Sequence, residues 1–221
     1  MRKNWWKFLT SLLVVYVVIY GFLGIVPRQP ILNETIRNVY FHVPMWFGMM
    51  TLMIASLIYS IKYLRNGKIS DDIYAVEFAN VAILFGILGF ITGSIWGNYT
   101  WGDPLPKDPK LIAVEVGMLI YSAYFVLRGS FEDEQKKARL SAVYNIFAFA
   151  AFMPLVWILP RLTDSLHPGN GGNPAFGKYD MDSAMRIVFY PAVIAWTLLG
   201  LWIGTLRIRV NLVKNSILDR K

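Results

Sequence analysis

The sequence has no cysteine, only two histidines in 221 residues, and only 16% charged residues. The lack of cysteine excludes disulfide frameworks, zinc–thiolate sites, iron–sulfur ligation and thiol catalysis within this chain. A soluble domain usually carries about 25% charged and about 45–50% apolar residues, whereas 56% of this chain is hydrophobic. The shortage of charge argues against a water-soluble globule, and the apolar excess excludes intrinsic disorder.

Six apolar runs are long enough to cross a membrane. A spanning helix needs about 20 mostly apolar residues, because each residue rises about 1.5 Å through a hydrocarbon core about 30 Å thick. The runs cover residues 5–26, 40–64, 74–97, 111–127, 141–160 and 184–206. The first run is too long for a signal peptide and no small-x-small cleavage site follows it, so we expect it to remain as an anchor. The sequence therefore predicts one all-α integral membrane domain, residues 1–221, folded as a six-helix bundle with structured outer loops.

Lysine and arginine are distributed unequally between the two sides that six spans define. Both termini share one side with the second and fourth loops, and that side holds 15 of the 22 lysines and arginines. The positive-inside rule therefore predicts that both termini lie in the cytoplasm. This topology accounts for the net charge of +8. We accordingly expect a lipid bilayer, and no nucleic acid, as a partner.

Both histidines fall on the opposite, outer side. Its loops are residues 27–39, 98–110 and 161–183. They hold eight of the eleven prolines when Pro160 at the edge is counted, and such loops are expected to fold against each other or against something bound. His42 precedes Pro44 at the mouth of the second span, and His167 lies in the third outer loop. Because Pro44 suits a first helical turn, we expect His42 at or just outside the start of its helix.

Two histidines at one level, with none elsewhere, suggest a pair of metal ligands. Taken singly, each is more simply explained as an interfacial side chain bonded to a loop carbonyl. Imidazole is the commonest metal ligand in proteins, and two imidazoles can hold haem iron from opposite faces. A tetrahedral zinc site stays open as an alternative, because carboxylates could complete it. The carboxylates in the outer loops are Asp103, Asp108, Asp164, Asp180 and Asp182.

An aromatic segment, residues 96–111, lies between the two histidines in the sequence. Aromatic rings are enriched at membrane interfaces, so Trp96, Tyr99 and Trp101 taken one at a time fit an aromatic belt. Together with two glycines and several charges, they also fit a shelf for a flat apolar ligand with anionic groups, such as haem with its propionates. The cations that could pair with propionates are Arg37, Lys107, Lys110 and Arg161.

Two acids lie inside the predicted spans. An ionised group at the bilayer centre costs about 2.5–3.5 kcal/mol on insertion scales. Glu77 lies near the cytoplasmic end of the third span and Glu115 about one turn inside the fourth. Both side chains can therefore reach the interface, and neither requires a proton relay. Asn80 and Asn145 are expected to bond to neighbouring helices.

Three features together resemble one family of membrane proteins. They are His42 before Pro44, the tryptophan-rich second outer loop, and His167 before Pro168. The family is the haem-handling C protein of cytochrome c maturation (CcmC), within the wider group named for a tryptophan-rich WWD segment. The resemblance covers essentially the whole chain, including the six spans and the placement of both histidines outside.

The match to the family segment is partial. That segment runs approximately Trp-Gly-x-Trp-Trp-x-x-Asp-x-Arg/Lys-Leu. Here Trp101-Gly102 opens it, Asp108-Pro109-Lys110-Leu111 closes it, and Pro104-Leu105 replaces the central tryptophan pair. Either the stacking shelf is absent from this chain, or its role passes to the three aromatic side chains of the segment.

The resemblance implies that the protein holds haem b, as cargo, at the periplasmic surface of the bacterial inner membrane. His42 and His167 would be the axial ligands of the haem iron. The remaining haem-binding residues would be Trp96, Tyr99, Trp101, Asp108 and Lys110. The family also implies a membrane-tethered haem chaperone as recipient, and an ABC-type complex with an ATPase subunit and a small membrane protein. The chain shows no P-loop and no nucleophile–base set, so we expect a non-enzyme.

Two other functions compete with haem transfer. A membrane subunit of an ABC-type transporter would be expected to carry broken helices at the bilayer midplane, and Pro154 and Pro191 are a weak pair of candidates. A haem-bearing anchor of a quinone oxidoreductase would place its histidines along facing helices, whereas both histidines here lie at the outer rim.

Overall fold

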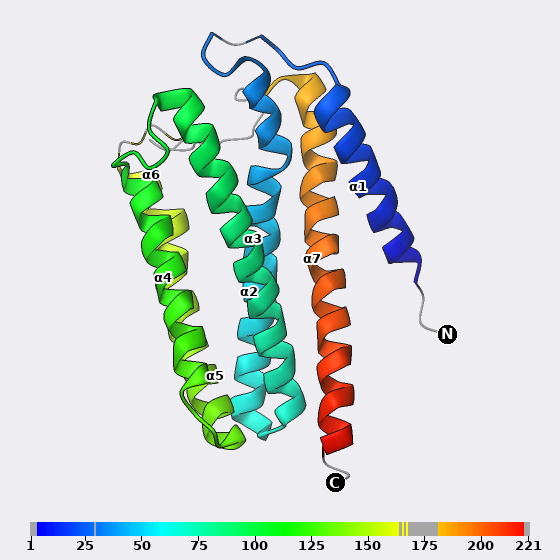
Figure 1. Cartoon of the computed structure of the whole chain (residues 1–221), viewed down its shortest axis with the longest axis vertical. Helices are drawn as coiled ribbons and strands as arrows, with labels where there is room; N and C mark the ends of the chain where they lie inside the picture. Colours follow the sequence, from blue (N-terminus) through cyan, green and yellow to red (C-terminus); the bar gives the residue numbers. More distant parts are fainter. Residues whose placement is uncertain (1–3, 29, 164, 166, 168–180, 219–221) are drawn as a thin grey trace.

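Long helices packed side by side along one axis form the molecule (Figure 1). The computed structural model describes residues 4–28, 30–163, 165, 167 and 181–218. Six helical segments in these ranges are long and apolar enough to cross a membrane, and the described residues contain no strand. The elements are α1 (Trp5–Leu23), the 3-10 helix η1 (Asn33–Tyr40), α2 (His42–Asn66), α3 (Ile69–Trp101), α4 (Pro109–Gly129), α5 (Glu134–Met153), the π-helical η2 (Pro154–Ile158), α6 (Leu159–Leu162) and α7 (Ser183–Leu218). The predicted all-α, six-span fold is confirmed.

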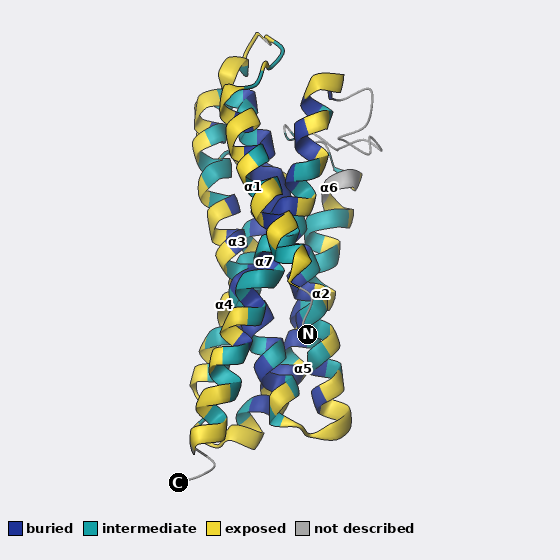
Figure 2. Ribbon diagram, turned by 90° about the vertical axis from the view of Figure 1, so that its right-hand side faces the viewer, coloured by how far each residue is buried: buried dark blue, intermediate teal, exposed yellow. Residues whose placement is uncertain are grey.

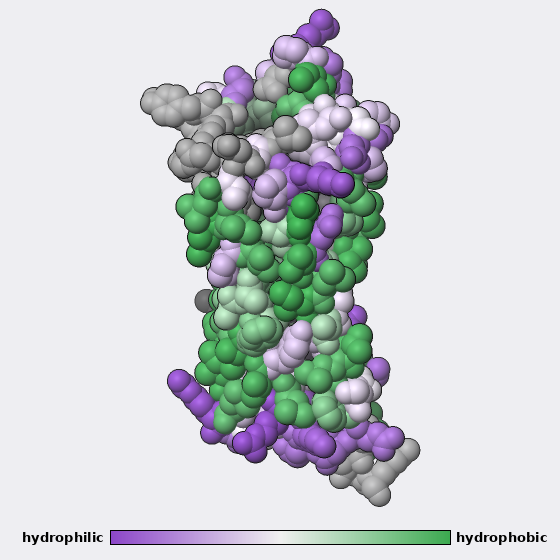
Figure 3. Space-filling model, turned by 90° about the vertical axis from the view of Figure 1, so that its left-hand side faces the viewer, coloured by the Kyte–Doolittle hydropathy of each residue, from purple (hydrophilic) through white to green (hydrophobic). Residues whose placement is uncertain are grey.

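Apolar side chains cover the outside of the bundle between two polar ends, as Figure 3 shows for one face. Leu88 and Ile91 of α3 and Val116 and Leu119 of α4 are among the large apolar side chains that the bundle leaves exposed. An apolar surface of this extent is unfavourable in water but suits contact with acyl chains. The protein is therefore a multi-pass membrane protein.

Burial is concentrated on α2, whereas α1 lies at the periphery (Figure 2). In the most apolar window of each span, 56% of residues are buried in Asn33–Asn66 but only 17% in α1. The end of α1 is held by Arg37 of η1, whose guanidinium donates to the carbonyls of Gly21 at 3.2 Å and Gly24 at 2.6 Å. These are the carbonyls that a helix end leaves unsatisfied, so Arg37 fastens α1 to the bundle.

A small polar cluster joins α2 to α5 inside the bundle. The amide nitrogen of Asn145 donates to the hydroxyls of Ser56 and Ser60, both at 2.8 Å. All three side chains are buried. The prediction that Asn145 bonds to a neighbouring helix is confirmed, and its physical reason is that an amide within the apolar layer has no water to bond.

Two helices run past the ends of their apolar runs. The predicted outer loop at 98–110 begins later in the structure, because α3 continues to Trp101 and ends at Gly102, whose φ of 76° lies in the left-handed region. No proline and no positive-φ residue lies within α3 itself, so the helix propagates into the polar layer. At the other end of the bundle, α7 extends beyond the predicted end at Leu206 to Leu218, and Ile208 is buried in the core.

The fifth span is built from three successive elements instead of one helix. Pro154 follows α5 directly and opens the π-helical turn η2, after which α6 carries the chain to Leu162. Proline lacks the N–H that would continue the α-helical hydrogen bonds, and one wider turn absorbs the mismatch. Pro191, by contrast, lies within an α7 that continues without interruption.

We name the two ends of the bundle after the sidedness that the sequence predicts. The outer end carries η1 and the α3–α4 connection, and the inner end carries the α2–α3 and α4–α5 connections (Figure 1). At the inner end, Arg128 donates to both carboxylate oxygens of Asp72, at 2.8 and 2.5 Å. These contacts tie α4 to α3.

Glu77 also lies at the inner end, where its carboxylate is buried and paired. Its side chain is only 6% exposed and pairs with Arg207 at 2.5 Å. It also accepts a hydrogen bond of 2.6 Å from the amide of Asn211. The extension of α7, which the sequence analysis did not predict, brings these partners alongside α3. A paired carboxylate can therefore stay inside the bundle.

Candidate functional site

His42 is the first residue of α2, as its position two residues before Pro44 predicts. The imidazole is buried, and its Nδ1 lies 2.9 Å from the carbonyl oxygen of Gly89 on α3. A carbonyl only accepts hydrogen bonds, so Nδ1 carries the proton and donates it there. In the neutral ring, Nε2 then keeps its lone pair, which is the arrangement of a metal-ligating histidine fixed by a backbone carbonyl.

The missing side chain of Gly93 makes room for this ring on α3. A Cβ atom at Gly93 would lie 2.7 Å from Cε1 of His42, a distance at which atoms must move apart. Thr92, its neighbour, places its hydroxyl oxygen 3.2 Å from the same Nδ1 atom. The surface of α3 therefore sets both the position and the tautomer of His42.

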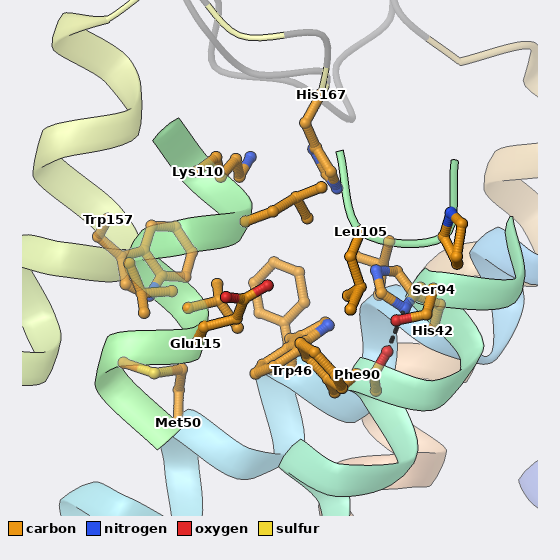
Figure 4. Close-up of a pocket in the computed structure, with 18 residues that line it drawn as sticks. His42, Trp46, Met50, Phe90, Ser94, Leu105, Lys110, Glu115, Trp157 and His167 are labelled. Carbon is orange, nitrogen blue, oxygen red and sulfur yellow. Dashed lines mark hydrogen bonds between the residues drawn. The ribbon is translucent and has the colours of Figure 1, made fainter. Parts of the chain in front are cut away.

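His167 lies opposite His42, although the two are 125 positions apart in the chain. Their ring centres are 6.5 Å apart and the ring planes make an angle of 42°. In Figure 4, the side chain of His167 points toward the cavity, and His42 lies below His167 in this view. The structure thus brings together the two histidines that the sequence analysis singled out.

A chain of hydrogen bonds through Asp108 ties the His167 loop to α4. The backbone N–H of His167 donates to the hydroxyl oxygen of Ser165 at 3.0 Å, and that hydroxyl donates to Oδ1 of Asp108 at 2.9 Å. The same Oδ1 accepts from the backbone N–H of Lys110 at 2.9 Å and caps the start of α4. Asp108 is buried, so its place in the site is to hold the loop and the helix together.

A cavity of about 130 Å³ opens beneath the two histidines. Its walls come from α2, α3, α4 and η2, and its aromatic lining is Trp46, Phe47, Phe90 and Trp157. Lys110 borders it near His167, and the carboxylate of Glu115 points into it (Figure 4). The cavity therefore has apolar aromatic walls, two imidazoles on one side, and one cation and one anion placed by α4.

The three aromatic residues predicted to form a shelf do not line this cavity. The Trp96 ring is 6.0 Å from the His42 ring, edge to face, and its Nε1 donates to the Thr35 hydroxyl at 3.2 Å. Trp101 packs over Gly97 one turn earlier in α3. Tyr99 is 70% exposed.

The positions of the missing tryptophan pair do line the cavity. Pro104 and Leu105, which stand where the family segment has two tryptophans, both border it. The aromatic walls instead come from Trp46, Phe47, Phe90 and Trp157, none of which was predicted to belong to the site. One signal could have identified Trp46: it follows His42 by four residues, which places both side chains on one face of α2. Phe90 and Trp157 carry no comparable signal, because their approach depends on how α3 and η2 pack.

The cations considered as propionate partners and the carboxylates considered as zinc ligands lie in different surroundings. Arg37 is engaged with α1 and with Glu34, Lys107 is exposed, and Lys110 alone of the described cations borders the cavity. The side chain of Arg161 lies outside the described residues. Of the carboxylates considered for zinc, Asp103 and Asp182 accept backbone N–H groups in exposed turns, and Asp164 and Asp180 lie outside the described residues. Within the described residues, no group of three or more metal-ligating side chains occurs.

The spacing of the two imidazoles fits opposite sides of one metal ion. An imidazole nitrogen lies about 2.0–2.1 Å from a bound first-row metal, so two such rings have centres roughly 6–6.5 Å apart. The observed 6.5 Å agrees with this separation. The aromatic walls suit a flat apolar ring system around that metal, and Lys110 suits an anionic group at its edge. The donor set therefore fits an iron porphyrin.

Comparison with known proteins gives a consistent result. The model of the family described as "Heme exporter protein C" (CcmC) matches residues 1–221. Among proteins named Heme exporter protein C, that of Paracoccus denitrificans is 24% identical over 200 residues, covering 90% of this chain and 82% of the relative. That of Bradyrhizobium diazoefficiens is 26% identical over 194 residues, covering 86% and 69%. That of Escherichia coli is 22% identical over 213 residues, covering 94% and 82%.

Proposed function

This chain belongs to the Heme exporter protein C family, and we propose on that basis that it handles haem for cytochrome c maturation. Haem b is held as cargo at the outer end, with His42 and His167 as the axial ligands of its iron. The observation that carries this proposal is the 6.5 Å separation of the two rings. It is supported by the bond from Nδ1 of His42 to Gly89, which leaves Nε2 available as a ligand.

The shape of the cavity supports temporary display of the ligand. Pockets that enclose small molecules usually measure about 300–1,000 Å³, whereas this cavity measures about 130 Å³. A porphyrin bound between the two histidines would therefore leave part of its surface outside the protein. Exposure of one edge suits a protein that passes haem on, because a recipient can contact the ligand before it is released.

The other residues named for haem binding either lie close to the ligand or act at a distance from it in this proposal. Lys110 at the edge of the cavity pairs with a propionate, and Trp96 packs against the His42 ring. Asp108 acts at a distance, by holding the loop that carries His167. Trp101 supports the end of α3, and Tyr99 contributes to the interfacial aromatic belt.

The remaining parts of the proposal follow from the family and from the charge distribution. The protein lies in the bacterial inner membrane with both termini in the cytoplasm, and His42 and His167 face the periplasm. It delivers haem to a membrane-tethered chaperone and works with ABC-type partner subunits and a small membrane protein. It catalyses no reaction itself, and any ATP hydrolysis belongs to a partner.

An absorption spectrum tests the assignment of the ligands. The detergent-purified protein loaded with haem should show a low-spin Soret band, and the His42→Ala/His167→Ala double variant should retain at least tenfold less haem. In His167→Gly, added imidazole should restore the low-spin spectrum, because it replaces the missing ligand directly. Tyr99→Ala is a matched control, since this exposed ring should leave the band unchanged. A full low-spin band in the double variant would contradict the proposal.

Chemical labelling tests the orientation separately. The chain has no native cysteine, so a single introduced thiol reports its own side of the membrane. Lys107→Cys at the outer end should react with an impermeant reagent added to the periplasm, and Arg139→Cys at the inner end should not; both positions are exposed. Labelling of Arg139→Cys alone would reverse the topology without affecting the ligand assignment.

The transporter alternative receives one supporting observation, the break of the fifth span at Pro154. Transporters of that class typically have paired helix breaks, whereas α7 continues through Pro191 without a break. Haem flux through proteoliposomes containing this chain alone would favour the alternative, whereas binding without flux supports display. The quinone oxidoreductase reading is not favoured, because His42 begins its helix and His167 lies in a loop.

A further inference from the structure

A second, larger cleft opens at the inner end of the bundle, remote from the histidines. It measures about 440 Å³, within the range of about 300–1,000 Å³ that is usual for ligand pockets. Its walls are the start of α3, the end of α4, the first turn of α5 and the last turns of α7. None of the sequence motifs or the haem proposal involves this cleft.

The lining combines an apolar wall with cations and amides. Val76 and Phe125 contribute apolar surface from α3 and α4, and Arg128, Lys137 and Asn215 contribute hydrogen-bond donors. This combination occurs where the apolar belt of the bundle gives way to its polar end, the level at which phospholipid headgroups meet a membrane protein (Figure 3).

The ion pairs in and beside the cleft do not involve Lys137, so the charge of this cation is not neutralised by them. Arg128 donates to both oxygens of Asp72, and Glu77 is matched by Arg207 and by the amide of Asn211. These four charged side chains sum to zero, so Glu77 does not present a free negative charge to an incoming anion.

Lys137 and Asn215 are the donors that remain. Among the described residues, the Lys137 ammonium and the Asn215 amide have no hydrogen-bond or ion-pair partner. Lys137 is half-buried, so its charge is partly shielded from water and an anion bound beside it would be favourable. An ammonium and an amide that converge on one cleft are suitable donors for the oxygens of a phosphate.

We propose that this cleft binds the phosphate-bearing headgroup of an anionic phospholipid, with Lys137 as the charged contact and Asn215 as a neutral donor. The apolar wall of Val76 and Phe125 accounts for a lipid in preference to a soluble phosphate, because an acyl chain would lie against it. Clusters of basic residues at the cytoplasmic surface attract anionic lipids by about 1 kcal/mol per Lys or Arg. The proposal is independent of haem binding.

The test is native mass spectrometry of the detergent-purified full chain incubated with dihexanoyl phosphatidylglycerol or dihexanoyl phosphatidylcholine. The wild type should retain the anionic lipid in preference to the zwitterionic one. Lys137→Gln should weaken retention of phosphatidylglycerol roughly fivefold. The matched control is Lys136→Gln, because the adjacent ammonium lies over the Phe131 ring, outside the cleft.

Three further outcomes are decisive. Asn215→Leu should weaken retention less than Lys137→Gln, since it removes a neutral donor. Equal losses in the Lys136 and Lys137 variants would overturn the proposal, because the attraction would then be a general surface effect. A competition arm with inorganic phosphate separates the sources: displacement only at concentrations far above that of the lipid supports a lipid site, and displacement at equal concentration overturns it in favour of a soluble anion.

Discussion

The two ends of the bundle bury polar side chains in contrasting ways. At the inner end, Asp72 and Glu77 are each matched by an arginine, so the polar groups satisfy one another and hold helices together. At the outer end, His42 uses one nitrogen to bond Gly89 and keeps the lone pair of the other. A saturated polar cluster contributes to stability, whereas one with spare bonding capacity is suited to bind a ligand. The contrast is between two clusters: the paired carboxylates of Asp72 and Glu77 hold helices together, whereas His42 keeps one ring nitrogen for a ligand.

Breaking the inner end should produce the largest effect on stability. Asp72→Ala leaves Arg128 buried without its partner, and losing one member of a buried pair costs about 3–5 kcal/mol. Unfolding in mixed micelles with increasing SDS, followed by circular dichroism, should show this loss. Asp71→Ala is the control, because its contact with Asn66 is exposed and should be worth less than about 1 kcal/mol. Equal destabilisation by the two variants would refute the contrast.

Displacing His42 without touching it should produce the next largest effect, on haem retention. Gly93→Ala places a Cβ atom 2.7 Å from Cε1 of the ring, and overpacking of this kind costs about 1–3 kcal/mol, so retention should fall roughly tenfold. Gly129→Ala is a matched control, since no atom lies within 4 Å of its added Cβ. Alanine raises helix propensity at both positions, so a loss confined to Gly93→Ala cannot come from the helix.

Weakening the hydrogen bonds that hold the His167 loop should have a smaller effect on haem affinity. Asp108→Ala removes the cap of α4 and the acceptor for Ser165, and losing a cap costs about 0.5–2 kcal/mol. Haem titration should show a severalfold weaker affinity, with the Soret position unchanged because both ligands remain. Asp108→Asn keeps an oxygen acceptor and should lose less. If Asp108→Asn were as weak as Asp108→Ala, a direct electrostatic role would replace the positioning role.

Restoring an aromatic ring at the cavity should have the smallest effect, and in the opposite direction. Leu105 borders the cavity where the family segment has a tryptophan, and stacking of aromatic rings adds about 0.5–1.5 kcal/mol. Leu105→Trp should therefore raise haem affinity roughly two- to tenfold in the same titration. Leu119→Trp, on the exposed face of α4, should leave it unchanged. No gain from Leu105→Trp would show that the cavity walls already supply the stacking.

The spans could be predicted because their signal is local. Each needs only a sufficient run of apolar residues, and all six runs identified in the sequence correspond to spanning helices. The ends were harder to predict. The last turns of α3 up to Trp101 and the extension of α7 beyond Leu206 contain polar residues, so they lie outside the apolar runs from which the spans were predicted. The extension of α7 packs against the bundle through Ile208 and pairs with Glu77 through Arg207 and Asn211. The burial of Glu77 depends on that extension.

The candidate site likewise has features that a local sequence signal predicts and features that depend on packing between distant segments. The position of His42 at a helix start follows from Pro44, and the level of His167 follows from counting spans. The distance between their rings does not follow, because it depends on the Asp108–Ser165 tether and on the gap at Gly93. The aromatic walls were missed for a similar reason. Trp46, Phe90 and Trp157 come from three elements, and only their packing brings them to one cavity.

The π-helical turn at Pro154–Ile158 also determines which of its own residues reach the outer cavity, because Val156 and Trp157 lie in this turn and line that cavity. A wide turn of this kind accommodates one more residue than an α-helical turn. Deleting one residue here would straighten the turn into a regular α-helix, and the chain after it would keep its register because the extra residue is taken up locally. The side chains within the turn would change direction, however, so the indole of Trp157 would lose its place in the wall. One irregular turn thus sets the composition of one aromatic wall.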